Sequence, residues 1–121
     1  FKEIIEQVQQ DLFIIQANLA GADKKLSPEK IKNLENIINE VEKELPKIKT
    51  FFLSGGTEMG SLLDYARAVV RRAERRIVKL SGSGKVDGEM LAYMNRLSSL
   101  LYALARFVNF KSGAKEESPS Y

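Results

Sequence analysis

The sequence predicts an all-α protein, an antiparallel up-and-down bundle of helices. Apolar residues recur at spacings of three and four in four separate segments, which is the pattern of an amphipathic helix. No segment alternates apolar and polar residues with a period of two, so we expect no β-sheet. Most connections between the segments are short, and helices joined by short connections fold most simply as antiparallel neighbours. Within the 121 residues we expect one helical domain at 1–110 and a polar, disordered tail at 111–121.

The first two helices are bounded by turn-forming residues. We predict the first helix over 1–20, because Gly21 is a natural stop. Ser27 and Pro28 open the second helix as a hydroxyl N-cap and a proline at the first helical position. Pro46 then ends the second helix, because proline cannot continue the backbone hydrogen bonds.

The third helix begins at Thr57, which can cap it, and runs to about Leu80; the fourth begins near Asp87. The connection at 47–60 is long for a bundle turn and rich in glycine and phenylalanine, and such loops are often functional. Its backbone N–H groups suit an anion, although a plain connection with a buried phenylalanine explains the same residues. The apolar face expected for the third helix consists of Leu62, Leu63, Ala66, Val69, Val70, Ala73 and Ile77.

The composition excludes several kinds of chemistry. The chain contains neither cysteine nor histidine, which removes disulfides, thiolate catalysis and the usual general base. A two-metal carboxylate site of the kind found in four-helix bundles normally needs Glu-x-x-His pairs, so we discard it. No apolar run approaches the length of a membrane span and no secretion signal is visible, so we expect a cytoplasmic protein that does not enter a membrane.

The positive charge is concentrated on the third helix. The net charge is only +3, yet five arginines and Lys79 lie between positions 67 and 80 against a single acid, Glu74. Guanidinium groups bind phosphate through two parallel hydrogen bonds, so this helix suits a particular anion. A solvated helix face with Asp64 and Glu74 as local ion-pair partners is the alternative interpretation. Binding to RNA is a third, which we disfavour because the helix lacks interleaved exposed aromatic residues.

Asn95 is the polar residue of interest on the fourth helix. It lies beside a strongly apolar face, between Leu91 and the pair Ser98 and Ser99. A polar group in that position needs a partner. The partner is either a neighbouring helix, which would make Asn95 a buried structural amide, or a ligand.

Several segments share their order and spacing with one known family. Residues 51–56 read Phe-Phe-Leu-Ser-Gly-Gly and resemble the family's Phe-x-Leu-Pro-Gly-Gly loop. Residues 66–76 read Ala-Arg-Ala-Val-Val-Arg-Arg-Ala-Glu-Arg-Arg and resemble its arginine helix. Residues 95–98 and 104–109 resemble its closing helix, and 10–13 also fit. The chain is therefore identified, by resemblance, as a member of the PduO-type ATP:cob(I)alamin adenosyltransferases, and the resemblance covers nearly all of it.

The resemblance implies an assembly and a set of partners. The family's bundle has five helices and forms a homotrimer, with ATP, Mg²⁺ and the corrinoid substrate cob(I)alamin bound between subunits. A reductase that supplies the reduced cobalt and a B12-dependent enzyme that receives the product are the further partners it allows; no nucleic acid and no membrane are expected. The family also begins with a phosphate-binding segment that does not precede Phe1 here, and we expect that segment to be encoded upstream.

The resemblance also implies roles for individual residues. Phe51 would lie on the lower face of the corrin and keep the axial position of the cobalt free. Arg67 would form an ion pair at the subunit interface. ATP would be held by Arg71, Arg72, Glu74, Arg75 and Asn95, with Phe51 and Arg71 as the catalytic residues.

The implied chemistry agrees with the missing histidine and cysteine. Cob(I)alamin is itself a strong nucleophile, so the protein has to supply orientation and charge rather than a nucleophile. Two positions depart from the family pattern: Ser54 replaces a proline, and Ser99 replaces an acid. The runner-up interpretation is a corrinoid chaperone or nucleotide sensor that uses the same pocket without catalysis.

Overall fold

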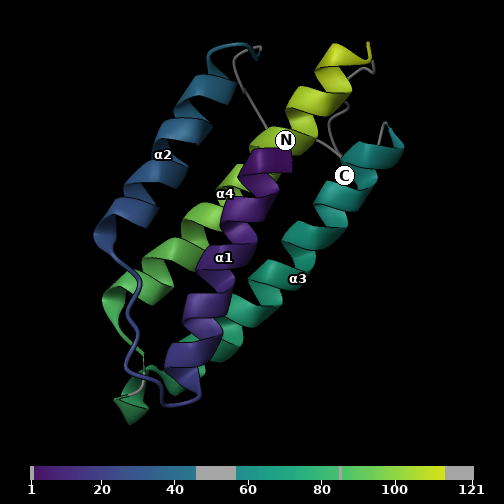
Figure 1. Cartoon of the computed structure of the whole chain (residues 1–121). Coiled ribbons are helices and arrows are strands. Elements are labelled where there is room, and N and C mark those ends of the chain that lie inside the picture. The colour runs from purple at the N-terminus through teal and green to yellow at the C-terminus, as the bar shows by residue number, and fades with distance from the viewer. Residues whose placement is uncertain (1, 46–56, 85, 114–121) are drawn as a thin grey trace.

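The computed structural model describes residues 2–45, 57–84 and 86–113 and shows an all-helical bundle within them (Figure 1). The helices run alternately in opposite directions along the bundle, as the sequence predicts, and no strand occurs in the described residues. Phe51, Ser54 and most of the predicted loop lie outside those residues. The elements are α1 (Lys2–Leu19), α2 (Pro28–Glu42), α3 (Glu58–Leu80), the short 3₁₀ helix η1 (Ser81–Ser83) and α4 (Gly88–Lys111).

Side-chain caps set the starts of two helices, and a proline sets the start of a third. The Thr57 hydroxyl accepts a hydrogen bond from the Gly60 N–H at 2.9 Å, as its sequence position predicts. The Asp87 carboxylate likewise accepts from the Met90 N–H at 2.8 Å and starts α4. Ser27 has the extended backbone of an N-cap, but its side chain makes no capping bond, so Pro28 with its fixed φ opens α2. At its other end, α2 stops at Glu42, before the proline that was expected to end it.

The fourth helix is the centre of the bundle. It packs closely against α3, antiparallel, and against α2, parallel, whereas α2 and α3 are not close neighbours. Tyr93, Leu100 and Leu104 are completely buried along it. Because α4 is covered on several sides, its apolar surface is far wider than a single amphipathic stripe.

The expected apolar face of α3 is wrong at two positions. Leu63 and Ile77 are buried against the core, but Leu62 is 57% exposed and Val69 is 45% exposed. The 3.6-residue period places both of them at the margin of the buried stripe, beyond the reach of α4. Together with Tyr65, which is 71% exposed, they form an outward apolar stripe on α3.

The first helix is attached differently from the others. Its backbone lies farther from its neighbours, and only Asp11 and Ile15 are buried on it. Val8 and Leu12 are partly buried against the core. Side-chain contacts, including one buried carboxylate, therefore attach α1 to the bundle.

None of the described helices is long and apolar enough to cross a membrane.

Candidate active site

The contact between α3 and α4 has a fixed register, which determines which side chains can act together. The Thr57 hydroxyl donates to the Asn109 carboxamide oxygen at 2.6 Å, and a methyl group on Gly60 would collide with that same oxygen. Farther along, the Arg67 guanidinium lies over the Tyr102 ring, 4.9 Å from its centroid. From Gly60 to Arg67 and from Asn109 to Tyr102 the step is seven residues on each helix, about two turns.

One further step of seven residues brings Glu74 of α3 level with Asn95 of α4. Both positions continue the stripes that hold Arg67 and Tyr102, because residues seven apart lie nearly above one another on a helix. The Glu74 side chain is half-buried and Asn95 is exposed. The register therefore places two of the residues predicted to hold ATP at the same level of the helix pair.

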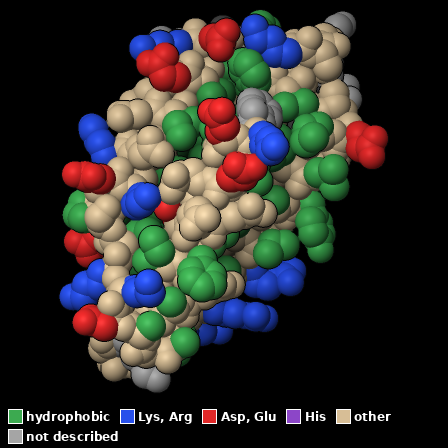
Figure 2. Space-filling view, in the orientation of Figure 1, with side chains coloured by type: hydrophobic (Ala, Val, Ile, Leu, Met, Phe, Trp, Pro, Cys, Tyr) green, Lys and Arg blue, Asp and Glu red, His purple; other side chains and the backbone are tan. Residues whose placement is uncertain are grey.

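The arginines predicted to hold ATP flank this level of the helix pair. Arg71 and Arg75 lie one turn apart on the same side of the half-buried stripe and are exposed, as is Arg72 on the far side of α3. Figure 2 shows the Lys and Arg side chains gathered at the lower right edge, over the C-terminal half of α3. Within the described residues, none of the guanidinium groups of Arg71, Arg72, Arg75 and Arg76 forms an ion pair. The alternative interpretation is therefore wrong about ion pairs between these arginines and Glu74, although the arginines are exposed to solvent as it expected. Their charge stays available for an anion.

Asn95 is not a buried structural amide. Its neighbours Tyr93, Met94 and Leu97 face the core, so Asn95 lies on the solvent-exposed side of α4. Its backbone carbonyl accepts a hydrogen bond from the Ser99 hydroxyl at 3.3 Å, one turn later. The interpretation that Asn95 is a buried amide satisfied by a neighbouring helix is wrong, because the exposed side chain can hydrogen-bond to water, and its role toward ATP stays a prediction.

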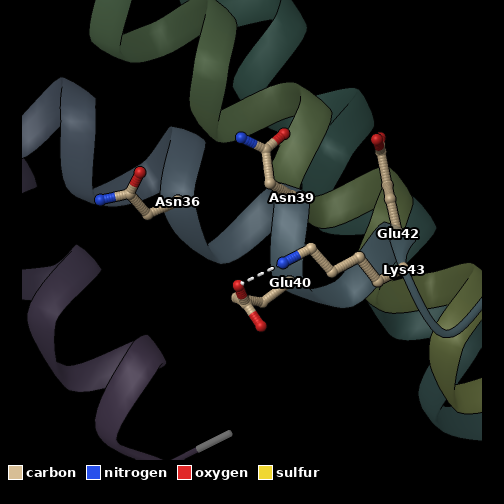
Figure 3. Close-up of a pocket in the computed structure, with 5 residues that line it drawn as sticks. All are labelled: Asn36, Asn39, Glu40, Glu42 and Lys43. Atoms are coloured by element: carbon tan, nitrogen blue, oxygen red, sulfur yellow. Dashed lines mark hydrogen bonds and ion pairs between the residues drawn. The ribbon is translucent and has the colours of Figure 1, made fainter.

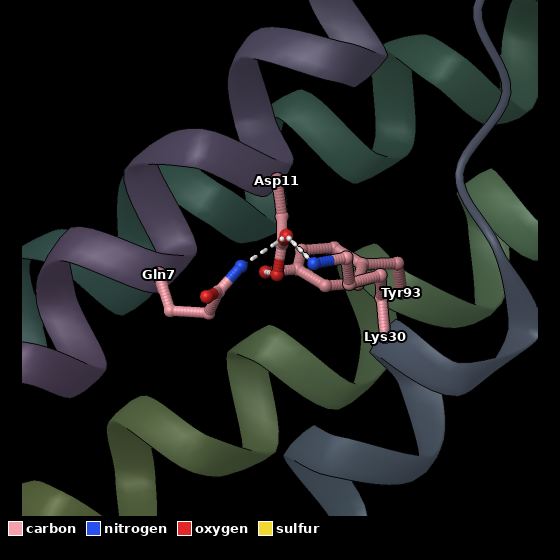
Figure 4. A network of polar contacts seen from close by, with 4 residues as sticks. All are labelled: Gln7, Asp11, Lys30 and Tyr93. Carbon is pink, nitrogen blue, oxygen red and sulfur yellow. Dashed lines mark hydrogen bonds and ion pairs between the residues drawn. The ribbon is translucent and has the colours of Figure 1, made fainter.

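A buried polar network was not foreseen from the sequence. The Asp11 carboxylate is completely buried and accepts hydrogen bonds from the Tyr93 hydroxyl at 2.8 Å and from the Gln7 amide at 2.9 Å. The Lys30 ammonium lies 3.5 Å from the same carboxylate. Figure 4 shows the four side chains meeting from α1, α2 and α4. One feature of the sequence could have predicted the network: Asp11 lies on α1 between Val8 and Ile15, which both face the core.

Tyr93 stays protonated in this network. Burial raises the pKa of its phenol above the ordinary range, and the hydrogen bond to Asp11 and the charge of that carboxylate raise it further. The phenol therefore acts as a neutral donor to a carboxylate. This network ties α1 to α4 two residues before Asn95, so it belongs to the support of the site rather than to its chemistry.

The surface hollows along α2 are weaker candidates for the active site. One is lined by Asn36, Asn39, Glu40, Glu42 and Lys43, all from α2 and its C-cap, and the Lys43 ammonium is already paired with Glu40 at 3.0 Å (Figure 3). No arginine lines it. The described residues also contain no cluster of carboxylates that could hold a metal ion.

The basic helix does carry one exposed aromatic residue. Tyr65 lies on the same outer side of α3 as Arg72 and Arg76, so the expectation that no exposed aromatic accompanies the arginines is wrong at that position. A single ring is still short of the successive stacking surfaces that single-stranded nucleic acid uses.

Comparison with known proteins identifies the family. Residues 1–108 match the family model described as cobalamin adenosyltransferase. The chain belongs to this family. It is 42% identical over 110 residues to the corrinoid adenosyltransferase of Bacillus subtilis (strain 168), a match that covers 88% of the chain and 57% of that relative. It is 38% identical over 102 residues to the corrinoid adenosyltransferase MMAB of Homo sapiens, covering 84% of the chain and 40% of that protein. The chain thus spans about half the length of these relatives.

Solved structures of the family share the fold. A phenylalanine-to-alanine variant of the PduO-type ATP:corrinoid adenosyltransferase from Lactobacillus reuteri, complexed with cobalamin and ATP, superposes with a TM-score of 0.90 and 31% identity. The match covers 98% of this chain and 70% of that one. An arginine-to-lysine variant of the same enzyme, complexed with ATP, gives a TM-score of 0.89 at the same identity. These matches confirm the resemblance to the PduO-type family and the helical-bundle fold.

Proposed function

We propose that this protein transfers the 5′-deoxyadenosyl group of ATP to cob(I)alamin, forming adenosylcobalamin and releasing triphosphate. One observation carries the proposal: the register of α3 against α4 makes Glu74 level with Asn95, beside arginines that have no ion-pair partner within the described residues. The names of the relatives support it, since proteins of this family bind ATP and cobalamin in solved structures.

The proposed reaction is a nucleophilic displacement at the ribose C5′. The cobalt(I) electron pair forms the Co–C bond, while the C5′–O bond breaks and its electron pair leaves with the triphosphate. Arg71, Arg72 and Arg75 would hold the phosphates, whose charge the guanidinium groups stabilise as the leaving group departs. Glu74 and Asn95 would orient the nucleotide through an acceptor and an amide. Magnesium, when bound with the nucleotide, would supply further charge on the phosphates.

Phe51 completes the proposal, although it lies outside the described residues. It precedes the start of α3 by seven residues, and α3 carries the nucleotide-holding arginines. An aromatic ring against the corrin would exclude an axial ligand and make the cobalt easier to reduce. We expect Phe51→Ala to lower turnover with cob(II)alamin and a reductant much more than it lowers ATP affinity; an unchanged turnover would contradict this role.

We also propose that the protein is a homotrimer with its sites between subunits. Two different flanks of α3 suit such an assembly: the exposed stripe of Leu62, Tyr65 and Val69 on one side, and Arg67 on the other. A ring of identical subunits needs two unlike surfaces that meet head to tail. A reductase, a B12-dependent enzyme that receives the product, and a cytoplasmic location stay predictions.

The experiment is an adenosyl-transfer assay with matched arginine variants. The protein, as its gene encodes it, is mixed with ATP, Mg²⁺ and chemically reduced cobalamin, and the cobalt spectrum reports formation of the Co–C bond. Arg71→Ala should lower kcat by roughly 100-fold to 1000-fold, the usual cost of losing one preorganised charge contact to a transition state. Arg76→Ala is the control, because Arg76 is also exposed on the same helix but is not among the residues proposed to hold ATP.

Each outcome of this assay has a clear meaning. Equal losses in the two variants would contradict a specific site beside Asn95 and favour a general effect of basic charge. Binding of ATP and corrinoid without any Co–C bond formation by the wild type would favour the chaperone or sensor. A salt-sensitive mobility shift with generic RNA, together with no binding of ATP, would contradict the proposed function altogether.

A further inference from the structure

Asn95 lies between two side chains that are bound to other helices. Tyr93, two residues before it, is completely buried, and its hydroxyl donates to the Asp11 carboxylate of α1 at 2.8 Å. Arg96, the next residue along the chain, forms an ion pair with Glu35 of α2, and its Nε lies 3.8 Å from a carboxylate oxygen. Polar contacts from both α1 and α2 therefore hold the turn of α4 that carries Asn95.

These two contacts differ in strength. The side chains of the ion pair are 43% and 41% exposed, and exposed ion pairs contribute little. The bond between Tyr93 and Asp11 is buried and has a charged acceptor, which makes it roughly twice as strong as a neutral hydrogen bond. The carboxylate is itself fixed by the Gln7 amide at 2.9 Å and the Lys30 ammonium at 3.5 Å (Figure 4). The buried bond is therefore the contact that can fix α4.

The buried hydrogen bond limits how far α4 can rotate about its own axis. Hydrogen bonds between two oxygens span about 2.5–3.0 Å, so the Tyr93 hydroxyl can move by about 0.5 Å before the bond weakens. The hydroxyl lies at or beyond the outer radius of the helix, about 5–6 Å from the axis, where this movement is a rotation of roughly 5° at most. Asn95 lies about 200° farther around the same helix and turns by the same angle. The bond therefore keeps the Asn95 amide within about 0.5 Å of one position.

A ligand contact needs a tolerance of that size. Groups that bind a ligand or act on it have to be held within about 0.5 Å of their productive geometry. A misplacement of about 1 Å can lower activity about 100-fold, even when the substitution is far from the chemistry. Asp11 and Tyr93 are completely buried, so any effect that they have on a nucleotide passes through the helix.

We propose that Tyr93 is a positioning residue for Asn95, and that its hydrogen bond to Asp11 sets the rotation of α4 at which the Asn95 amide meets ATP. The inference rests on the proposed function, which gives Asn95 its contact with ATP, and extends it to two buried residues to which that function gives no role. Attachment of α1 alone does not require this bond, because well-packed apolar side chains often replace a buried charged contact without loss of stability. A directional hydrogen bond, by contrast, fixes an angle.

A double-mutant cycle on ATP binding tests the proposal. The dissociation constant of ATP with Mg²⁺ is measured by calorimetry for the wild type, Tyr93→Phe, Asn95→Ala and the double variant, with each protein as its gene encodes it and at a temperature where circular dichroism shows it folded. Tyr93→Phe should weaken ATP binding by about twofold to thirtyfold, the range for residues that are coupled to a ligand without touching it. In the Asn95→Ala background the same substitution should have no effect, because the group that it positions is gone.

Further variants separate positioning from stability. Leu104→Val shortens a completely buried side chain on the same helix, away from Asn95, and should lower the melting temperature without changing ATP affinity. Asp11→Asn keeps an oxygen that can accept from the phenol, so its ATP affinity should stay within about twofold of the wild type. Asp11→Ala keeps no acceptor and should weaken ATP binding as much as Tyr93→Phe does.

Several results would overturn the inference. It is wrong if Tyr93→Phe binds ATP as the wild type does while Asn95→Ala binds it more weakly, or if the two effects multiply in the double variant. Equal weakening by Tyr93→Phe and Leu104→Val would show that lost stability, not positioning, changes the affinity. Unchanged ATP affinity in Asn95→Ala would remove the contact on which the inference rests.

Failure of the proposed function gives a different result. A wild type that binds ATP but forms no Co–C bond refutes adenosyl transfer, yet the cycle still tests positioning, because a dissociation constant needs no turnover. A wild type that binds no ATP refutes the proposed function, and the positioning of Asn95 toward ATP with it.

Discussion

Replacing Asp11 with alanine should destabilise the protein more than any surface substitution on α1. The carboxylate is completely buried and accepts from Tyr93, which is itself completely buried, and from Gln7. Its removal would leave the Tyr93 hydroxyl without an acceptor, which costs about 1–3 kcal/mol. It would also remove hydrogen bonds to a charged group, each of which contributes about 1.5–3 kcal/mol.

These contributions overlap, because the Tyr93 hydrogen bond is counted in both, so the expected loss is about 3–5 kcal/mol, the range observed when one partner of a buried pair is removed. Lys30 adds little to this sum, because its side chain is 35% exposed and can turn to water. A domain is stable by only about 5–15 kcal/mol, so the loss is a large fraction of the total. At about 4 °C per kcal/mol for a chain of this size, the melting temperature should fall by about 12–20 °C.

The assay is urea and thermal unfolding followed by circular dichroism, with two companion variants. Glu6→Ala is the control, since Glu6 lies on the same helix, is 59% exposed and has only a 4.0 Å ion pair with Lys2; we expect a change below about 0.5 kcal/mol. Adding Tyr93→Phe to Asp11→Ala should recover part of the loss, because the unsatisfied hydroxyl is gone. A loss below about 1 kcal/mol for Asp11→Ala would refute the view that this network attaches α1.

Three further predictions concern other parts of the bundle. Because the pKa of Tyr93 is raised in the folded protein, its contribution to stability is complete below the ordinary pKa of 10.0. That contribution is lost as the pH rises above 10.0, because only the unfolded chain then releases the proton. Urea midpoints at pH 7, 9 and 11 should therefore fall more steeply for the wild type than for Tyr93→Phe, and parallel curves would contradict this. Gly60→Ala should lower stability by about 1–2 kcal/mol although alanine favours helices, because the new methyl group displaces Asn109 from Thr57. In Gly88→Ala, where the methyl group meets open space, thermal unfolding should show unchanged or higher stability, and a loss equal to that of Gly60→Ala would refute the steric argument. Ser99→Asp, which restores the acid of the family pattern one turn from Tyr102, should raise the melting temperature by a few degrees if that acid reaches Arg67, and it should leave the melting temperature unchanged if it does not.

The sequence predicts the helices well because their signals are local. Thr57 and Asp87 cap the helices that they were expected to begin, and the apolar period alone places α3 and α4. The end of α2 was predicted less accurately. A helix usually ends at or before the residue that precedes a proline, so Pro46 sets only the last residue at which α2 could end, and α2 ends earlier, at Glu42.

The site was only partly predictable for the opposite reason. The arginines of α3 were visible as a periodic cluster, and Asn95 was visible as a polar residue beside the apolar face of the fourth helix. The burial of Asp11, by contrast, depends on Tyr93, which is 82 positions away, and no pattern within α1 reveals a partner on α4. The exposure of Leu62 and Val69 likewise depends on how far α4 extends across α3, which the period of one helix does not determine.

The seven-residue steps along α3 and α4 divide their contact into three separate levels. Gly60 with Asn109, Arg67 with Tyr102, and Glu74 with Asn95 are each about 10 Å from the next level along the helix axis. Substitutions that far apart usually have additive effects, whereas those within one level do not. Evolution could therefore change the helix start, the proposed subunit contact and the proposed nucleotide contact of this protein one at a time, without needing a compensating change in the other two.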